Sequence, residues 1–119
     1  MHKNIKNLIY IQNEIKSKIS EHKIKDYNPH IIAISKTFKI DHILPLIEYG
    51  HIHFGENKIQ EAMDKWSVIK NKNIKIKLHM VGKLQTNKVK FAIKIFDYIH
   101  SVDNIKLARK ISDEQKKNN

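Results

Sequence analysis

The chain has 119 residues, of which 40% are hydrophobic, so one domain with a real core is expected and the length is too short for two. No cysteine is present, which excludes disulfides, thiolate catalysis and cysteine-ligated metal sites. The net charge of +11 would suit a nucleic-acid partner, but Arg109 is the only arginine among 23 basic residues. Because base and phosphate recognition favours the forked arginine side chain, a nucleic-acid partner is disfavoured and a solvated lysine-coated surface is expected.

The N-terminal segment does not resemble a signal peptide. Residues 1–20 alternate apolar side chains with lysines and asparagines and contain no unbroken apolar run. No stretch approaches the roughly 20 apolar residues of a membrane span. A cytoplasmic protein without a membrane partner is therefore expected.

The first predicted element is a helix over residues 2–25, where leucines and isoleucines recur near the spacing of three and four. Tyr27-Asn28-Pro29 should end it, since the residue before a proline is pushed out of the helical region. Residues 31–34 are apolar and mostly β-branched. Such a run is typical of a strand that is buried on both faces.

Helices and strands alternate after this first strand. Asp41 can cap the next helix and Gly50 can end it, and Asp103 can cap the last helix. The same patterns predict further strands and helices. The strands cover residues 51–54, 76–81 and 98–101, and the helices carry the apolar positions of 59–69, 84–96 and 105–111.

This alternation indicates βαβ units and a parallel sheet, and hence an α/β fold in one domain over residues 1–119. A leading helix followed by four βα units is half of a (β/α)8 TIM barrel. A small open sheet with helices on both faces fits the same periodicity. The pattern of apolar residues alone does not separate the two.

Lys36 is the candidate for chemistry that the sequence places best. Working residues of parallel α/β folds lie just past the C-terminal ends of the strands, and Ser35-Lys36-Thr37 ends the first strand. A lysine in the crowded mouth of a sheet is expected to be poorly solvated, which favours the neutral amine. The neutral amine is the form that condenses with an aldehyde to a Schiff base. One of many lysines could also fall at a strand end by chance.

Histidines lie in or near three of the predicted strands. His79 is flanked by apolar residues, and a lone histidine there is more often a hydrogen-bonded core residue than a catalyst. His51, His53 and His100 do not have the spacing of a zinc site, so no metal is expected. Gly55 and Gly82 fall where a tight turn or a close backbone approach needs glycine, and neither belongs to a nucleotide-binding motif.

Four segments at the predicted strand ends form a pattern when they are taken together. In chain order they are Ala33-Ile34-Ser35-Lys36-Thr37, Phe54-Gly55-Glu56-Asn57 followed by Gln60-Glu61, His79-Met80-Val81-Gly82-Lys83-Leu84-Gln85-Thr86-Asn87-Lys88, and His100-Ser101-Val102-Asp103. The third segment is a specific HxxGxLQxNK pattern, whereas the Ser-Lys-Thr triplet alone would carry little weight. In this order the segments resemble a known family, the pyridoxal phosphate homeostasis proteins.

The resemblance implies a barrel like the N-terminal domain of alanine racemase, with pyridoxal 5'-phosphate as the cofactor. Lys36 would form the internal Schiff base, and Asn57 and His79 match positions that line the same pocket. The implied function is intracellular pyridoxal phosphate (vitamin B6) homeostasis without catalysis. Two alternatives are a fragment of a racemase-like enzyme that acts on amino acids and a non-functional fragment.

The chain departs from the family in length, because members are roughly twice as long, as eight βα units require. The loops that hold the cofactor phosphate in this family would follow the strands that are missing here. We therefore expect a truncated half barrel that binds the cofactor weakly by itself. Its unpaired strand edges favour self-association or pairing with a complementing C-terminal half.

Overall fold

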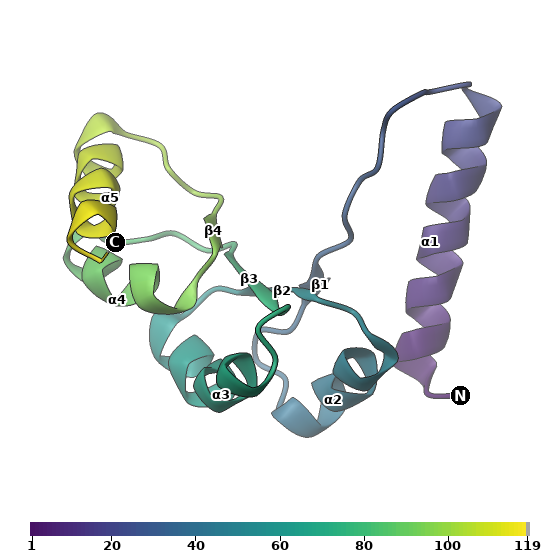
Figure 1. Ribbon diagram of the computed structural model, residues 1–119, viewed down its shortest axis with the longest axis horizontal. Helices are drawn as coiled ribbons and strands as arrows, with labels where there is room; N and C mark the ends of the chain where they lie inside the picture. The colour runs from purple at the N-terminus through teal and green to yellow at the C-terminus, as the bar shows by residue number, and fades with distance from the viewer. Residues whose placement is uncertain (119) are drawn as a thin grey trace.

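The computed structural model describes residues 1–118 and contains α-helices, one 3-10 helix and a single sheet (Figure 1). The helices are α1 (Lys3–Glu21), α2 (Ile40–Tyr49), α3 (Ile59–Lys72), α4 (Val89–Ile95) and α5 (Ile105–Lys117), with the 3-10 helix η1 at Thr86–Lys88. The strands are β1 (Ala33–Ile34), β2 (His53–Glu56), β3 (Lys77–Met80) and β4 (Tyr98–Ile99). The predicted leading helix and four βα units are confirmed.

The four strands form one parallel sheet in the order β1-β2-β3-β4. The helices that follow the strands lie on the same side of this sheet, with α2 and α3 directly against it (Figure 1). Sequential parallel strands with helices on one side make up the wall of a TIM barrel, whereas an open doubly wound sheet has helices on both faces. The fold is therefore the predicted half of a (β/α)8 barrel.

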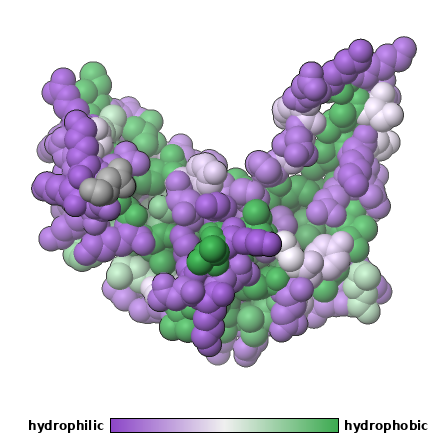
Figure 2. All heavy atoms as spheres, viewed as in Figure 1, coloured by the Kyte–Doolittle hydropathy of each residue, from purple (hydrophilic) through white to green (hydrophobic). Residues whose placement is uncertain are grey.

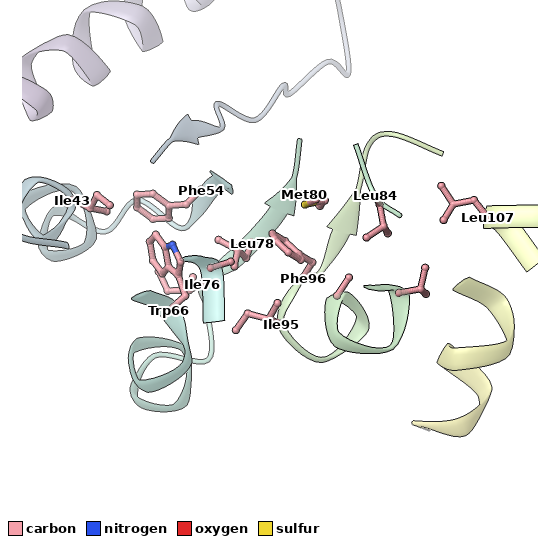
Figure 3. Close-up of a cluster of buried hydrophobic side chains, with 13 residues drawn as sticks. Ile43, Phe54, Trp66, Ile76, Leu78, Met80, Leu84, Ile95, Phe96 and Leu107 are labelled. Atoms are coloured by element: carbon pink, nitrogen blue, oxygen red, sulfur yellow. The ribbon is translucent and has the colours of Figure 1, made fainter. Parts of the chain in front are cut away.

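The hydrophobic core lies between the sheet and these helices (Figure 3). Phe54 and Leu78, from neighbouring strands, are completely buried, and Trp66 of α3 packs on Phe54 with 4.8 Å between the ring centroids. The other buried members are Ile43, Ala62, Ile76, Met80, Leu84, Val89, Ala92, Ile95, Phe96 and Leu107. Burial of apolar surface at about 25 cal/mol per Å² makes this layer the main source of stability.

The opposite face of the sheet, which we call the open face, would point into the interior of a complete barrel. The chain rises on either side of it as two arms, one formed by α1 and the segment 22–32, the other by α4 and α5 (Figure 1). Polar residues coat the arms, and apolar patches are visible between them (Figure 2). Ile34 is 47% exposed and Tyr98 49% exposed. The prediction that strand 31–34 is buried on both faces is wrong, because only one face has helices packed on it.

Helix α1 ends earlier than predicted. It stops at Glu21, His22 caps it, and Lys23 turns the chain with a φ of 54°. Tyr27-Asn28-Pro29 lies farther on, in the extended segment that leads to β1. Although α1 has 19 residues, neither it nor any other helix within residues 1–118 is apolar enough to cross a membrane.

The predicted helix caps are confirmed in one case and wrong in two. Gly50 ends α2 in the left-handed conformation, with a φ of 108°. Asp41 lies in the first turn of α2, and Lys39 takes the N-cap position without a side-chain hydrogen bond. Asp103 also does not cap, because Asn104 accepts the hydrogen bond from the backbone of α5. Two adjacent polar residues compete for one cap, and the backbone geometry selects the second.

The bounds of several other elements also differ from the predicted ones: β1 begins at Ala33, β4 ends at Ile99 and α4 begins at Val89. Strand β2 begins two residues later than predicted, because the N–H of His51 still bonds the Leu46 carbonyl at the end of α2. Gly55 and Glu56 are therefore strand residues. Helix α5 continues to Lys117 instead of ending near residue 111, and a pair between Glu114 and Lys110 lies on its added turns.

Candidate functional site

The C-terminal edge of the sheet, where the loops after the strands gather, carries two of the three predicted site residues. Ile34 pairs with Gly55, and Gly55 with His79. Lys36 and Asn57 each lie two residues beyond a member of the first pair. Both residues therefore lie at the same edge of the sheet, in the loops that follow β1 and β2. His79 lies one step deeper, within β3.

Lys36 is exposed. The expectation that its ammonium group is poorly solvated is therefore wrong for this chain. The physical reason is that an open half barrel leaves the mouth of the sheet in contact with water on one side. The backbone on both sides of Lys36 is nevertheless held, since Ser35 is buried and the N–H of Thr37 donates to Glu61 Oε2 at 2.7 Å.

Asn57 is half-buried, and it follows β2 directly. Its Oδ1 atom is buried and has no hydrogen-bond partner among residues 1–118. Gly82 lies against it so closely that a Cβ on Gly82 would stand 2.7 Å from Asn57 Cβ and 2.9 Å from its carbonyl oxygen. The prediction that Gly82 serves a close backbone approach is confirmed. Gly55 serves the same purpose inside β2, where a Cβ would come within 2.8 Å of Ile34.

His79 is not isolated, because three strands bring histidines together on the open face. His53 Nδ1 lies 3.0 Å from His79 Nε2, and His79 Nδ1 lies 2.9 Å from His100 Nε2. Tyr98 stacks on the His79 ring with 4.5 Å between centroids. Each of the two contacts needs one N–H donor and one lone pair. Three neutral imidazoles satisfy both contacts when each ring donates in the same direction along the row.

The surroundings of this histidine row favour the neutral rings. Burial, followed by the neighbouring His100 and His53 rings, lowers the pKa of His79 from 6.5 to about 4. Burial also lowers the pKa of His53, and the nearby His30 adds to that effect. Near neutral pH, His53 and His79 are therefore uncharged.

From the sequence alone, His53 and His100 had no expected role, and their spacing only argued against a zinc site. Their proximity to His79 depends on the strand register, which offsets each histidine by two residues from the next across the sheet. Periodicity within one strand contains no information on that register. Within residues 1–118 no group of three or more histidine, aspartate or glutamate side chains is arranged to hold a metal ion.

Comparisons with known proteins point to one family. No family model matches the chain. The pyridoxal phosphate homeostasis protein of Pasteurella multocida is 31% identical over 92% of this chain and 47% of its own length. The protein of the same name from Haemophilus influenzae is 30% identical over 94% of this chain and 47% of its own length. The chain thus spans about half the length of these curated relatives.

Solved structures agree with the sequence matches. PipY of Synechococcus elongatus, determined with pyridoxal phosphate bound, superposes with a TM-score of 0.69 at 30% identity, covering 85% of this chain and 48% of PipY. A protein of unknown function from Bifidobacterium adolescentis superposes with a TM-score of 0.79 at 26% identity, covering 92% of this chain and 48% of its own. In both cases the half barrel aligns with about half of a longer structure.

Proposed function

We propose that this chain belongs to the pyridoxal phosphate homeostasis family over the half that it spans, and that it binds pyridoxal 5'-phosphate through Lys36. Its role would be intracellular vitamin B6 homeostasis, without catalysis. The observation that carries the proposal is the unpaired, buried Asn57 oxygen at the sheet edge where Lys36 also lies. A buried acceptor without a partner is costly, and a bound polar ligand at this edge would satisfy it.

The residues at the edge fit such a cofactor in their chemistry. When bound, pyridoxal phosphate supplies an aldehyde carbon, and a neutral lysine amine is the group that attacks an aldehyde. The exposed Lys36 amine would hold the cofactor covalently, and Asn57 would orient its polar ring substituents. His79 would line the deeper part of the pocket as a neutral ring, since its pKa is lowered to about 4.

We expect the described half to hold the cofactor weakly. The open face leaves Lys36 in water, and the phosphate group gains most of its orientation from charge-assisted contacts and helix N-termini. In the longer relatives, the length beyond the matched half is available to supply those contacts and to cover the open face. The cytoplasmic location and the single domain over residues 1–119 stay predictions.

Reduction with borohydride tests the proposal. Condensation of an amine with the aldehyde releases water, and the reductant converts the resulting C=N bond into a stable amine that peptide mass spectrometry can map. The chain has 22 lysines, which are its 23 basic residues less Arg109, so the position of the label is informative. We expect Lys36 to be labelled in preference to the other lysines at limiting cofactor.

The matched control is Lys39→Ala, which removes another exposed lysine three residues away, in comparison with Lys36→Ala. The proposal predicts that only Lys36→Ala abolishes the preferred label. Equal labelling of Lys36 and Lys39 in the unmodified chain would contradict it. Measurable racemisation of an amino acid by the chain with cofactor would contradict the non-catalytic part and favour the racemase-like alternative.

A further inference from the structure

Glu56, at the end of β2, carries a carboxylate that is fully buried on the helix side of the sheet. Its Oε2 atom accepts from Ser35 Oγ at 2.5 Å, from Trp66 Nε1 at 2.9 Å and from Lys65 Nζ at 3.0 Å. A buried charge is tolerated only when it is paired and hydrogen-bonded. The residue before Lys36 is thus tied to a site that has little freedom to move.

Lys65 of α3 extends this network to the backbone. Its side chain is only 8% exposed, and its Nζ donates to Glu56 Oε2, to Glu61 Oε2 at 2.9 Å and to the carbonyl oxygen of Ser35 at 2.8 Å. An ammonium group has three hydrogens, and here each has an acceptor. Lys65 therefore links the Ser35 peptide to the two carboxylates.

Glu61 completes the network on the other side of Lys36. Its Oε2 accepts the Thr37 N–H at 2.7 Å. The Lys65 hydrogen bond lowers the pKa of the Glu61 carboxyl, and the Thr37 N–H adds to this, so the group stays a charged acceptor. Thr37 has a φ of 68°, a left-handed conformation that is an outlier for a β-branched residue. Such strain persists only where surrounding contacts impose it.

We infer that Glu56, Lys65 and Glu61 are positioning residues for Lys36: they fix the peptides on both sides of it, so that its amine stays at the mouth of the open face. The inference deepens the proposed function and rests on it. None of the three needs to touch a cofactor, because they lie under the turn and act through Ser35 and Thr37. This role explains why two of the motif segments, those that contain Glu56 and Glu61, occur together with the Ser-Lys-Thr segment.

Helix α3 offers a matched pair of variants for the test. Glu61→Ala removes the acceptor of the Thr37 N–H. Asp64→Ala removes the same charge from an exposed residue of the same helix, whose side chain receives a hydrogen bond from Gln60 only. Glu61→Gln keeps a carbonyl oxygen for the Thr37 N–H, and it should rescue part of the effect.

The first readout needs no cofactor. Hydrogen exchange of the Thr37 amide should be roughly tenfold faster in Glu61→Ala than in Asp64→Ala, since a hydrogen bond to a charged acceptor is lost. The second readout is the preference of borohydride-trapped pyridoxal phosphate for Lys36 over Lys39. We expect that preference to disappear in Glu61→Ala, to remain in Asp64→Ala and to be intermediate in Glu61→Gln.

The two readouts keep the two proposals apart. If the unmodified chain shows no preference for Lys36, the proposed function fails, and the exchange experiment alone decides whether the turn is held by Glu61. If the unmodified chain prefers Lys36 and Glu61→Ala retains both the preference and the slow exchange, the positioning role is overturned. Should Glu61→Ala unfold, the comparison of Glu61→Gln with Asp64→Asn answers the same question in folded proteins.

Discussion

The two faces of the same sheet differ in how they satisfy their residues. On the helix side, Phe54 and Leu78 are buried in an apolar layer, and one oxygen of the Glu56 carboxylate accepts from three donors. On the open face, His53 and His79 bond to each other, while Ile34 remains half exposed. Alternate residues of the same strands thus form a buried apolar core on one side and a partly solvent-exposed face on the other.

The comparison shows which side of the sheet is packed without the second half of a barrel. On the helix side, α2, α3 and α4 supply the apolar cover. On the open face, His53, His79 and His100 contact one another, but Ile34 and Tyr98 remain about half exposed. Lys36 lies at the border of the two: its neighbours are anchored to the helix side, and its amine belongs to the open side.

The largest expected effect separates the two faces by packing. Phe54→Ala should lower the free energy of unfolding by about 3–5 kcal/mol, because a fully buried ring leaves a cavity against Trp66. Ile34→Ala on the open face should cost about 1 kcal/mol, since its side chain is already 47% exposed. Urea denaturation measures both, and similar losses would mean that the open face is covered in solution.

The second prediction concerns pH. The pKa of His79 is lowered from its ordinary value of 6.5 to about 4 in the folded chain, so the unfolded chain binds more protons between these values. Stability is therefore full above pH 6.5 and falls as the pH drops toward 4, by up to about 3 kcal/mol. His79→Gln should flatten this dependence, and His22→Gln, at an exposed histidine, should leave it unchanged. Identical pH slopes for the two variants would refute the lowered pKa of His79.

A third comparison sets a buried ion pair against an exposed one. Glu56→Gln should lower the free energy of unfolding by about 2 kcal/mol, because Lys65 keeps Glu61 and the Ser35 carbonyl but loses its buried partner. Glu21→Gln breaks the exposed pair with Lys18 and should change it by no more than about 0.5 kcal/mol. The same denaturation measurement applies, and a near-neutral Glu56→Gln would show that the network contributes no stability.

A fourth comparison adds a methyl group at each of two glycines. Gly82→Ala should cost about 2 kcal/mol, because its Cβ meets the backbone of Asn57, which has no room to move. Gly55→Ala meets the flexible end of Ile34 on the open face and should cost less than about 1 kcal/mol. Thermal unfolding ranks the two variants, and the reverse order would show that Ile34 is held in place.

Much of the candidate site could be predicted from the sequence, but the residues that hydrogen-bond to the neighbours of Lys36 could not. Lys36 could be selected because it ends an apolar strand between Ser35 and Thr37. Lys65 donates to the Ser35 carbonyl directly and is linked to Thr37 through Glu61. In the sequence it is one of many lysines, and nothing in its local pattern distinguishes it. The histidine row was missed for the same reason, since its members come from different strands.

Three features could be predicted from local sequence: the order and type of the elements, the parallel α/β class, and the strand end at which Lys36 lies. These follow from apolar periodicity, glycine and proline positions and motif segments, all of which act over a few residues. Only the tertiary structure decided the solvation of Lys36, the caps at Lys39 and Asn104, and the links from Glu61 and Lys65 to the turn. Those features depend on strand register and on which face is covered, and both are set by contacts between residues far apart in the chain.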